Sequence, residues 1–180
     1  VNGGSQAGLL PVWALTEEVL KLVAASVTVL WFRYADEPID MPIYMITVAL
    51  GFAAVENALF ILHPLIANTI VDAAQLGGVR FIGATLIHVV CSATIGTLLA
   101  FTFYKSYFSK FLACGIGVIL AGVLHAFFNF LILNVGVERG MTALLAIWMS
   151  TIFILVMLEK IKFLHRPAWW ESLSPKQLKL

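Results

Sequence analysis

Residues 111–135 read FLACGIGVILAGVLHAFFNFLILNV, a run of 25 residues without Asp, Glu, Lys or Arg. A helix of this length can cross the hydrocarbon core of a bilayer, which is about 30 Å thick. Four other runs of the chain are similarly apolar. The pattern predicts an all-α fold, a polytopic transmembrane helical bundle with about five membrane-spanning helices at Leu9–Phe32, Met41–Leu65, Val79–Tyr104, Phe111–Val135 and Met141–Leu158.

The composition excludes an ordinary soluble domain. Of the 180 residues, 61% are hydrophobic and only 12% are charged, whereas soluble domains carry about 25% charged residues. The length fits one domain, so residues 1–180 are expected to form a single integral-membrane unit embedded in the lipid bilayer. The net charge of +1 gives no indication of a nucleic-acid partner. Cys91 and Cys114 both lie in apolar runs, where cysteine usually serves as a small core residue.

The basic residues of the short connections indicate the orientation of the helices, because cytoplasmic connections are enriched in Lys and Arg. Only Arg80 and Arg139 fall on one side of the predicted bundle. The other side holds Arg33, Lys105, Lys110, Lys160, Lys162, Arg166, Lys176 and Lys179. The N-terminus is therefore expected on the extracytoplasmic side. A basic tail from about residue 159 is expected in the cytoplasm, with Trp169-Trp170 as an aromatic anchor at the lipid headgroups.

Three ionisable residues interrupt the first predicted span, in the stretch Thr16-Glu17-Glu18-Val19-Leu20-Lys21. Each charged side chain at the centre of a membrane helix costs about 2.5–3.5 kcal/mol on insertion scales. Lys21 follows Glu18 by three residues and Glu17 by four, so it can pair with either carboxylate on one helix face. A structural ion pair explains the lysine and one glutamate, and it leaves the other glutamate for a different role.

The next three predicted spans also carry ionisable or polar residues. Span two carries Glu56, which has no cation within one helical turn, and span three carries His88. Span four carries His125 and Asn129, which are four residues apart and therefore share a helix face. Glu17, Glu56 and the two histidines all lie roughly 12–15 Å below the outer ends of their spans. This common depth predicts one polar site near the extracytoplasmic face.

A layer of carboxylates and imidazoles inside a membrane protein suits the activation of water. A carboxylate in a low-dielectric setting is a better general base, so Glu17 or Glu18 is predicted to activate the water. We favour Glu17 as the base, with Glu18 paired to Lys21, and the reverse assignment stays open. Arg80 is a candidate for substrate contact at the outer rim.

The same layer also fits a metal site. Two His and one Glu form a recurring catalytic zinc site with an open fourth position, so Glu56, His88 and His125 are predicted to hold zinc. A metal-free reaction would use nearly the same residues, and both alternatives stay open. Asn129 is predicted to donate a hydrogen bond to the developing oxyanion. Ser92, one turn from His88, offers a weaker Ser–His alternative.

Four motifs on four consecutive spans resemble those of the PrsW-type intramembrane proteases: Glu17-Glu18-x-x-Lys21, Phe52-x-x-x-Glu56-Asn57, His88 and His125-x-x-x-Asn129. The chain is more distantly similar to the CAAX-protease and bacteriocin-processing (CPBP) membrane proteases, in which the second motif usually has His at the position of Glu56. The last motif of the family often has Asp where this chain has Asn129. The amide argues against a metal ligand or a base at that position.

This resemblance implies an intramembrane endopeptidase of a bacterial or archaeal cell membrane, either a metalloprotease or a glutamate-type peptidase. Its expected substrates are transmembrane or membrane-anchored proteins, such as anti-sigma factors, which undergo a first-site cleavage near the extracytoplasmic side.

Two other classes of protein use buried Glu and His residues. A proton-coupled transporter or proton relay would need a polar path through both leaflets, but the inner halves of spans two to four are almost purely apolar. A haem protein with His88 and His125 as axial ligands would leave the carboxylates unexplained. The remaining alternative is a membrane scaffold without activity.

Overall fold

The computed structural model describes residues 3–30, 34–66, 70–134 and 137–171, with side chains described for 9–30, 34–62, 81–131, 142 and 144–170. All long elements of the described chain are helices. These elements are α1 (Gly3–Ala25), a π-helical segment (Ser26–Leu30), α2 (Asp40–Ile66), α3 (Ile70–Phe101), α4 (Tyr107–Asn134), α5 (Val137–Lys162) and the short α6 (Ala168–Glu171).

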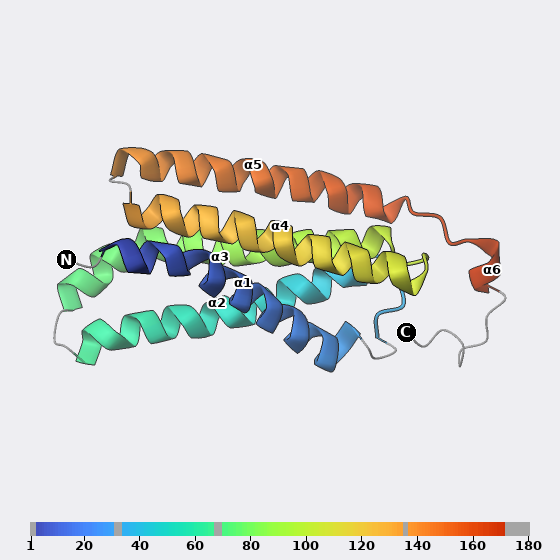
Figure 1. Ribbon diagram of the computed structural model, residues 1–180, viewed down its shortest axis with the longest axis horizontal. Helices are drawn as coiled ribbons and strands as arrows, with labels where there is room; N and C mark the ends of the chain where they lie inside the picture. The colour runs from blue at the N-terminus through green and yellow to red at the C-terminus, as the bar shows by residue number, and fades with distance from the viewer. Residues whose placement is uncertain (1–2, 31–33, 67–69, 135–136, 172–180) are drawn as a thin grey trace.

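The five long helices form one bundle (Figure 1). Helix α3 lies centrally and packs against α2, α4 and α5, while α1 packs mainly against α4. The helices alternate in direction, so α1 begins at the end of the bundle where α2 meets α3 and α4 meets α5 (Figure 1). The opposite end carries the connections from α1 to α2 and from α3 to α4, together with α6.

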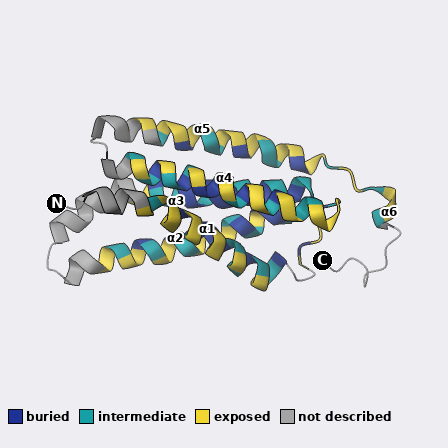
Figure 2. Ribbon diagram, viewed as in Figure 1, coloured by how far each residue is buried: buried dark blue, intermediate teal, exposed yellow. Residues whose placement is uncertain are grey.

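Four stretches of the described helices are long and apolar enough to cross a membrane: Asp40–Leu62, Phe81–Phe101, Tyr107–Leu131 and Leu144–Lys162. They correspond to predicted spans two to five. The first predicted span, Leu9–Phe32, covers most of α1 and the π-helical segment, and its last two residues lie outside the described part of the chain. It carries two carboxylates and a lysine and is not among these four stretches. Exposed apolar side chains cover α5 and the outer face of α4 (Figure 2), for example Phe153 on α5 and Phe111 on α4. This surface suits contact with lipid tails, and the predicted all-α membrane bundle is confirmed.

Two helices extend beyond the spans that were predicted from apolarity. Helix α3 begins at Ile70, before the predicted span at Val79, so part of the connection between spans two and three is also helical. Helix α5 continues to Lys162, past the predicted end at Leu158. A formed helix gains one hydrogen bond for each added residue, so it extends beyond the point where the apolar pattern stops.

Glycines allow the helix backbones to approach closely. A Cβ atom on Gly96 of α3 would overlap the backbone of Pro42 in α2, with the Met41 carbonyl oxygen 2.8 Å away. A Cβ on Gly122 of α4 would come within 2.9 Å of Leu15 Cδ1 and 3.5 Å of Leu15 Cα in α1. Small residues serve this purpose at helix contacts in membrane proteins. The contact between Gly122 and Leu15 brings α1 against α4 one turn before the ionisable residues of both helices.

Candidate active site

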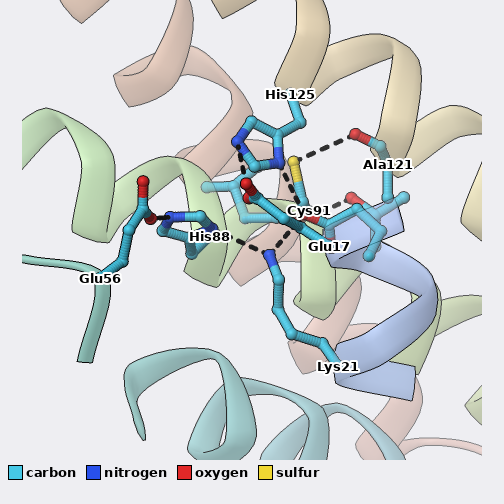
Figure 3. A network of polar contacts seen from close by, with 10 residues as sticks. Glu17, Lys21, Glu56, His88, Cys91, Ala121 and His125 are labelled. Atoms are coloured by element: carbon cyan, nitrogen blue, oxygen red, sulfur yellow. Dashed lines mark hydrogen bonds and ion pairs between the residues drawn. The ribbon is translucent and has the colours of Figure 1, made fainter. Parts of the chain in front are cut away.

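Six ionisable residues from four helices meet inside the bundle (Figure 3): Glu17, Glu18, Lys21, Glu56, His88 and His125. Four of them are buried, whereas the side chains of Glu17 and Glu56 remain 23% and 36% exposed. Glu56 contacts His88, and the rings of His88 and His125 touch edge to face, so these residues of α2, α3 and α4 share one level of the bundle.

Lys21 connects α1 to α3 within this layer. Its Nζ lies 2.5 Å from Glu18 Oε1 and 2.8 Å from His88 Nδ1, and it sits 5.0 Å from the centre of the Phe52 ring. An ammonium group can only donate hydrogen bonds, so His88 Nδ1 accepts one. The ring proton of a neutral His88 is then on Nε2, which donates to Glu56 Oε2 at 2.5 Å.

His125 is oriented by Glu18. Its Nδ1 lies 2.8 Å from Glu18 Oε1, and a carboxylate oxygen accepts, so the ring proton is on Nδ1. The lone pair of Nε2 then points toward Glu17 Oε2, 3.6 Å away. Glu17 Oε2 is buried and has no hydrogen-bond partner among the described residues. Two acceptors that face each other in this way attract a cation or a water molecule between them.

The donors around this gap fit a zinc ion. Ligand atoms of Glu17, His88 and His125 lie within 4.8 Å of one another, and two imidazoles with one carboxylate form a common catalytic zinc set. Glu18 supplies the carboxylate that typically holds the second nitrogen of a zinc-bound histidine. The set differs from the predicted one in a single member. Glu56 instead accepts a hydrogen bond from Nε2 of His88. Both nitrogens of His88 are therefore engaged, and His88 would have to release Lys21 or Glu56 to ligate a metal.

The remaining predicted residues lie around this layer. Asn129 is half-buried one turn beyond His125, and it forms no hydrogen bond with the described part of the chain. The Ser92 hydroxyl is buried without a hydrogen-bond partner among the described atoms, so it is not paired with His88. Arg80 belongs to α3, but its side chain lies outside the described residues.

Three neighbours of the layer were not predicted as part of the site. The Phe52 ring packs edge-on against His88, with ring centroids 5.4 Å apart. Cys91, one turn after His88, donates a weak hydrogen bond to the Ala121 carbonyl at 3.3 Å. Asn57 donates to Thr85 Oγ1 at 3.2 Å and ties α2 to α3. The helical spacing from Glu56 to Phe52 and from His88 to Cys91 could have suggested the first two.

The geometry disfavours both alternative classes. The His88 and His125 rings touch edge to face with centroids 4.9 Å apart, and their nitrogens face Lys21 and glutamates rather than a haem iron. Toward the opposite end of the bundle, fully buried residues are mostly apolar, such as Met45, Ala49 and Ile95. This interior does not suit a proton path through the whole membrane.

Apolar helices around a largely buried cluster of carboxylates, imidazoles and a lysine define an integral membrane protein with a polar site inside its bundle. The chain belongs to the PrsW family, because the family model described as "PrsW family intramembrane metalloprotease" matches residues 3–158. The match includes every residue of the layer, and the chain is therefore an intramembrane protease. No curated protein and no solved structure matches the chain.

Proposed function

We propose that this protease hydrolyses peptide bonds of membrane-protein substrates at the gap between Glu17 and His125. The observation that carries the proposal is the pair of facing acceptors, Glu17 Oε2 and His125 Nε2, 3.6 Å apart, with Glu17 Oε2 buried and unpartnered. A water molecule bound there would donate a proton to Glu17 as it attacks the peptide carbonyl. Glu17 suits this role because its side chain is partly exposed and carries no other hydrogen bond to its buried oxygen.

The other members of the layer hold the reacting groups in place. Glu18 fixes the tautomer of His125 and is itself neutralised by Lys21. Lys21 and Glu56 fix the tautomer of His88 from its two sides. Asn129 would stabilise the developing oxyanion, since its amide is one helical turn from His125 and has no hydrogen-bond partner among the described residues.

A zinc ion is proposed as the cofactor, held by Glu17, His125 and a His88 that has released either Lys21 or Glu56. It would supply Lewis acidity, polarising the water and the substrate carbonyl. One oxygen of Glu17 is enough to ligate a cation, so the second oxygen remains able to accept a proton. This donor set supports the family's description as metalloproteases.

The proposed orientation rests on the distribution of basic residues. Lys105, Lys110, Lys160, Lys162 and Arg166 lie at the end of the bundle opposite the site. We propose that this end faces the cytoplasm of a bacterial or archaeal cell and that the site lies near the extracytoplasmic face. A single-span protein such as an anti-sigma factor, cut near that face, is the proposed substrate.

The test is cleavage of a single-span membrane protein by the purified protease in proteoliposomes. Wild type should cut it close to the extracytoplasmic end of its span, and a variant with both Glu17→Gln and Glu18→Gln should not. Circular dichroism must show that the double variant keeps its helices. Cleavage that persists in a folded double variant would exclude this mechanism.

A further inference from the structure

A second group of potential metal ligands lies on the side of the His125 ring that faces Glu18 rather than Glu17. Glu18, Cys91 and His125 have exposures of 0%, 0% and 2%, and their ligand atoms all lie within 4.8 Å of one another. Figure 3 shows the Cys91 sulfur beside the His125 ring, away from Glu56. This group shares only His125 with the set Glu17, His88 and His125.

Two of these ligands have bonding capacity that the layer does not use. Glu18 Oε1 accepts from both Lys21 and His125, but Glu18 Oε2 is buried and has no hydrogen-bond partner among the described residues. The Cys91 thiol makes only the hydrogen bond to the Ala121 carbonyl, which is weak for sulfur. A buried carboxylate oxygen without a partner is costly unless something binds it.

We propose that Glu18, Cys91 and His125 form a second cation position that takes a thiophilic divalent ion, such as Cd²⁺, Co²⁺ or Zn²⁺ in excess. Glu18 Oε2, the Cys91 sulfur and His125 Nδ1 supply the ligands. The thiol releases one proton to solvent when the sulfur binds the ion. The resulting thiolate and the Glu18 carboxylate are both anionic ligands of the ion, and Glu18 Oε1 keeps its contact with Lys21. Soft thiolate ligands select this class of ion over Mg²⁺ or Ca²⁺.

Occupation of this position inhibits the protease. When His125 Nδ1 binds an ion, the ring proton moves to Nε2, because a neutral imidazole carries one proton. His125 Nε2 then has no lone pair to offer toward Glu17. The two cation positions therefore exclude each other, and a thiophilic ion competes with the catalytic arrangement through the shared ring. This consequence rests on the proposed function, whereas the existence of the second position does not.

Cobalt spectroscopy tests the position without any substrate. The chain has two cysteines, so the Cys114→Ala variant leaves Cys91 as the only thiol. Titration of this detergent-purified variant with excess Co²⁺ should produce a thiolate-to-cobalt charge-transfer band. The band should disappear when Cys91→Ala or Cys91→Ser is added. It should remain when Glu17→Gln is added instead, because Glu17 belongs only to the other position.

Absence of the band at saturating Co²⁺, or a band that survives removal of Cys91, would overturn the proposal. Cys91→Ser serves as the conservative variant, since its hydroxyl can still donate to the Ala121 carbonyl and preserve the packing. In the cleavage assay, Cd²⁺ should inhibit the Cys114→Ala protein. Adding Cys91→Ser should weaken this inhibition by at least the roughly 10–100-fold that loss of even an outer-shell partner costs. Equal inhibition in both proteins would contradict the inhibitory role while leaving proteolysis itself intact.

Discussion

Glu17 and Glu18 are adjacent in the chain and differ completely in their surroundings. Consecutive residues of a helix point about 100° apart, so the two side chains face different partners. Glu18 is fully buried and contacts Lys21 and His125. Glu17 is partly exposed, and its Oε2 faces only the lone pair of His125. These surroundings support the proposal that Glu18 stabilises the site and that Glu17 is the residue that reacts.

Replacement of the two glutamates one at a time should separate these roles. Glu17→Gln should lower the turnover rate by about 10²–10⁴-fold, the usual contribution of a general base, with little change in melting temperature. Glu18→Gln should lower both activity and stability, because it leaves the Lys21 ammonium buried without a carboxylate. Kinetics and thermal unfolding in detergent provide the two measurements. Equal loss of stability in both variants would contradict the division of roles.

The buried pair of Glu18 and Lys21 can be tested as a unit. Lys21→Met should destabilise the protein by about 3–5 kcal/mol, the usual cost when one partner of a buried ion pair is removed. A double variant with Glu18→Gln and Lys21→Met removes both charges and should regain part of this stability. A double-mutant cycle from unfolding in denaturant measures the coupling. Additive effects in the cycle would mean that the two residues do not interact.

At the level of helices, the position of α2 against α3 depends on Gly96. A Cβ at this position would overlap the backbone of Pro42, whereas Gly115 of α4 has nothing within 4 Å. Gly96→Ala should therefore push α2 away from α3, weaken the contact of Glu56 with His88 and reduce activity. Gly115→Ala should be neutral or stabilise α4 by up to about 1 kcal/mol, because alanine favours helix. If the two variants have the same activity and melting temperature, the close approach is not needed for the site.

The length and composition of the helices could be predicted from the sequence, and so could the common depth of the polar residues. Depth alone does not fix the rotation of a helix about its axis. For this reason the predicted metal set contained Glu56, whereas the structure brings Glu17 together with His88 and His125. Cys91 was predicted as a core residue and is buried, but its place beside Glu18 and His125 depends on how three helices pack. Such contacts are set by close approaches like that of Gly96 and Pro42, which no helical periodicity reveals.

For the whole molecule, charge and depth together predict which face of the membrane holds the site. Ser106 lies exposed at the turn between α3 and α4, and Thr142 lies exposed near the start of α5 at the other end. In a Cys114→Ala background, Thr142→Cys should react with a membrane-impermeant maleimide on intact cells. Ser106→Cys should react only after the cells are opened. The reverse pattern would place the site near the cytoplasmic face.

The gap between Glu17 and His125 is the proposed place where the cofactor and the reacting water are held. Metal analysis of the detergent-purified protein tests this directly, with wild type beside His125→Ala and with equal helical content verified for both. We predict about one zinc per chain in wild type, as in other three-ligand catalytic sites, and loss of that zinc in His125→Ala. A wild-type protein that cleaves its substrate without bound metal, or an unchanged zinc content in His125→Ala, would contradict the proposed site.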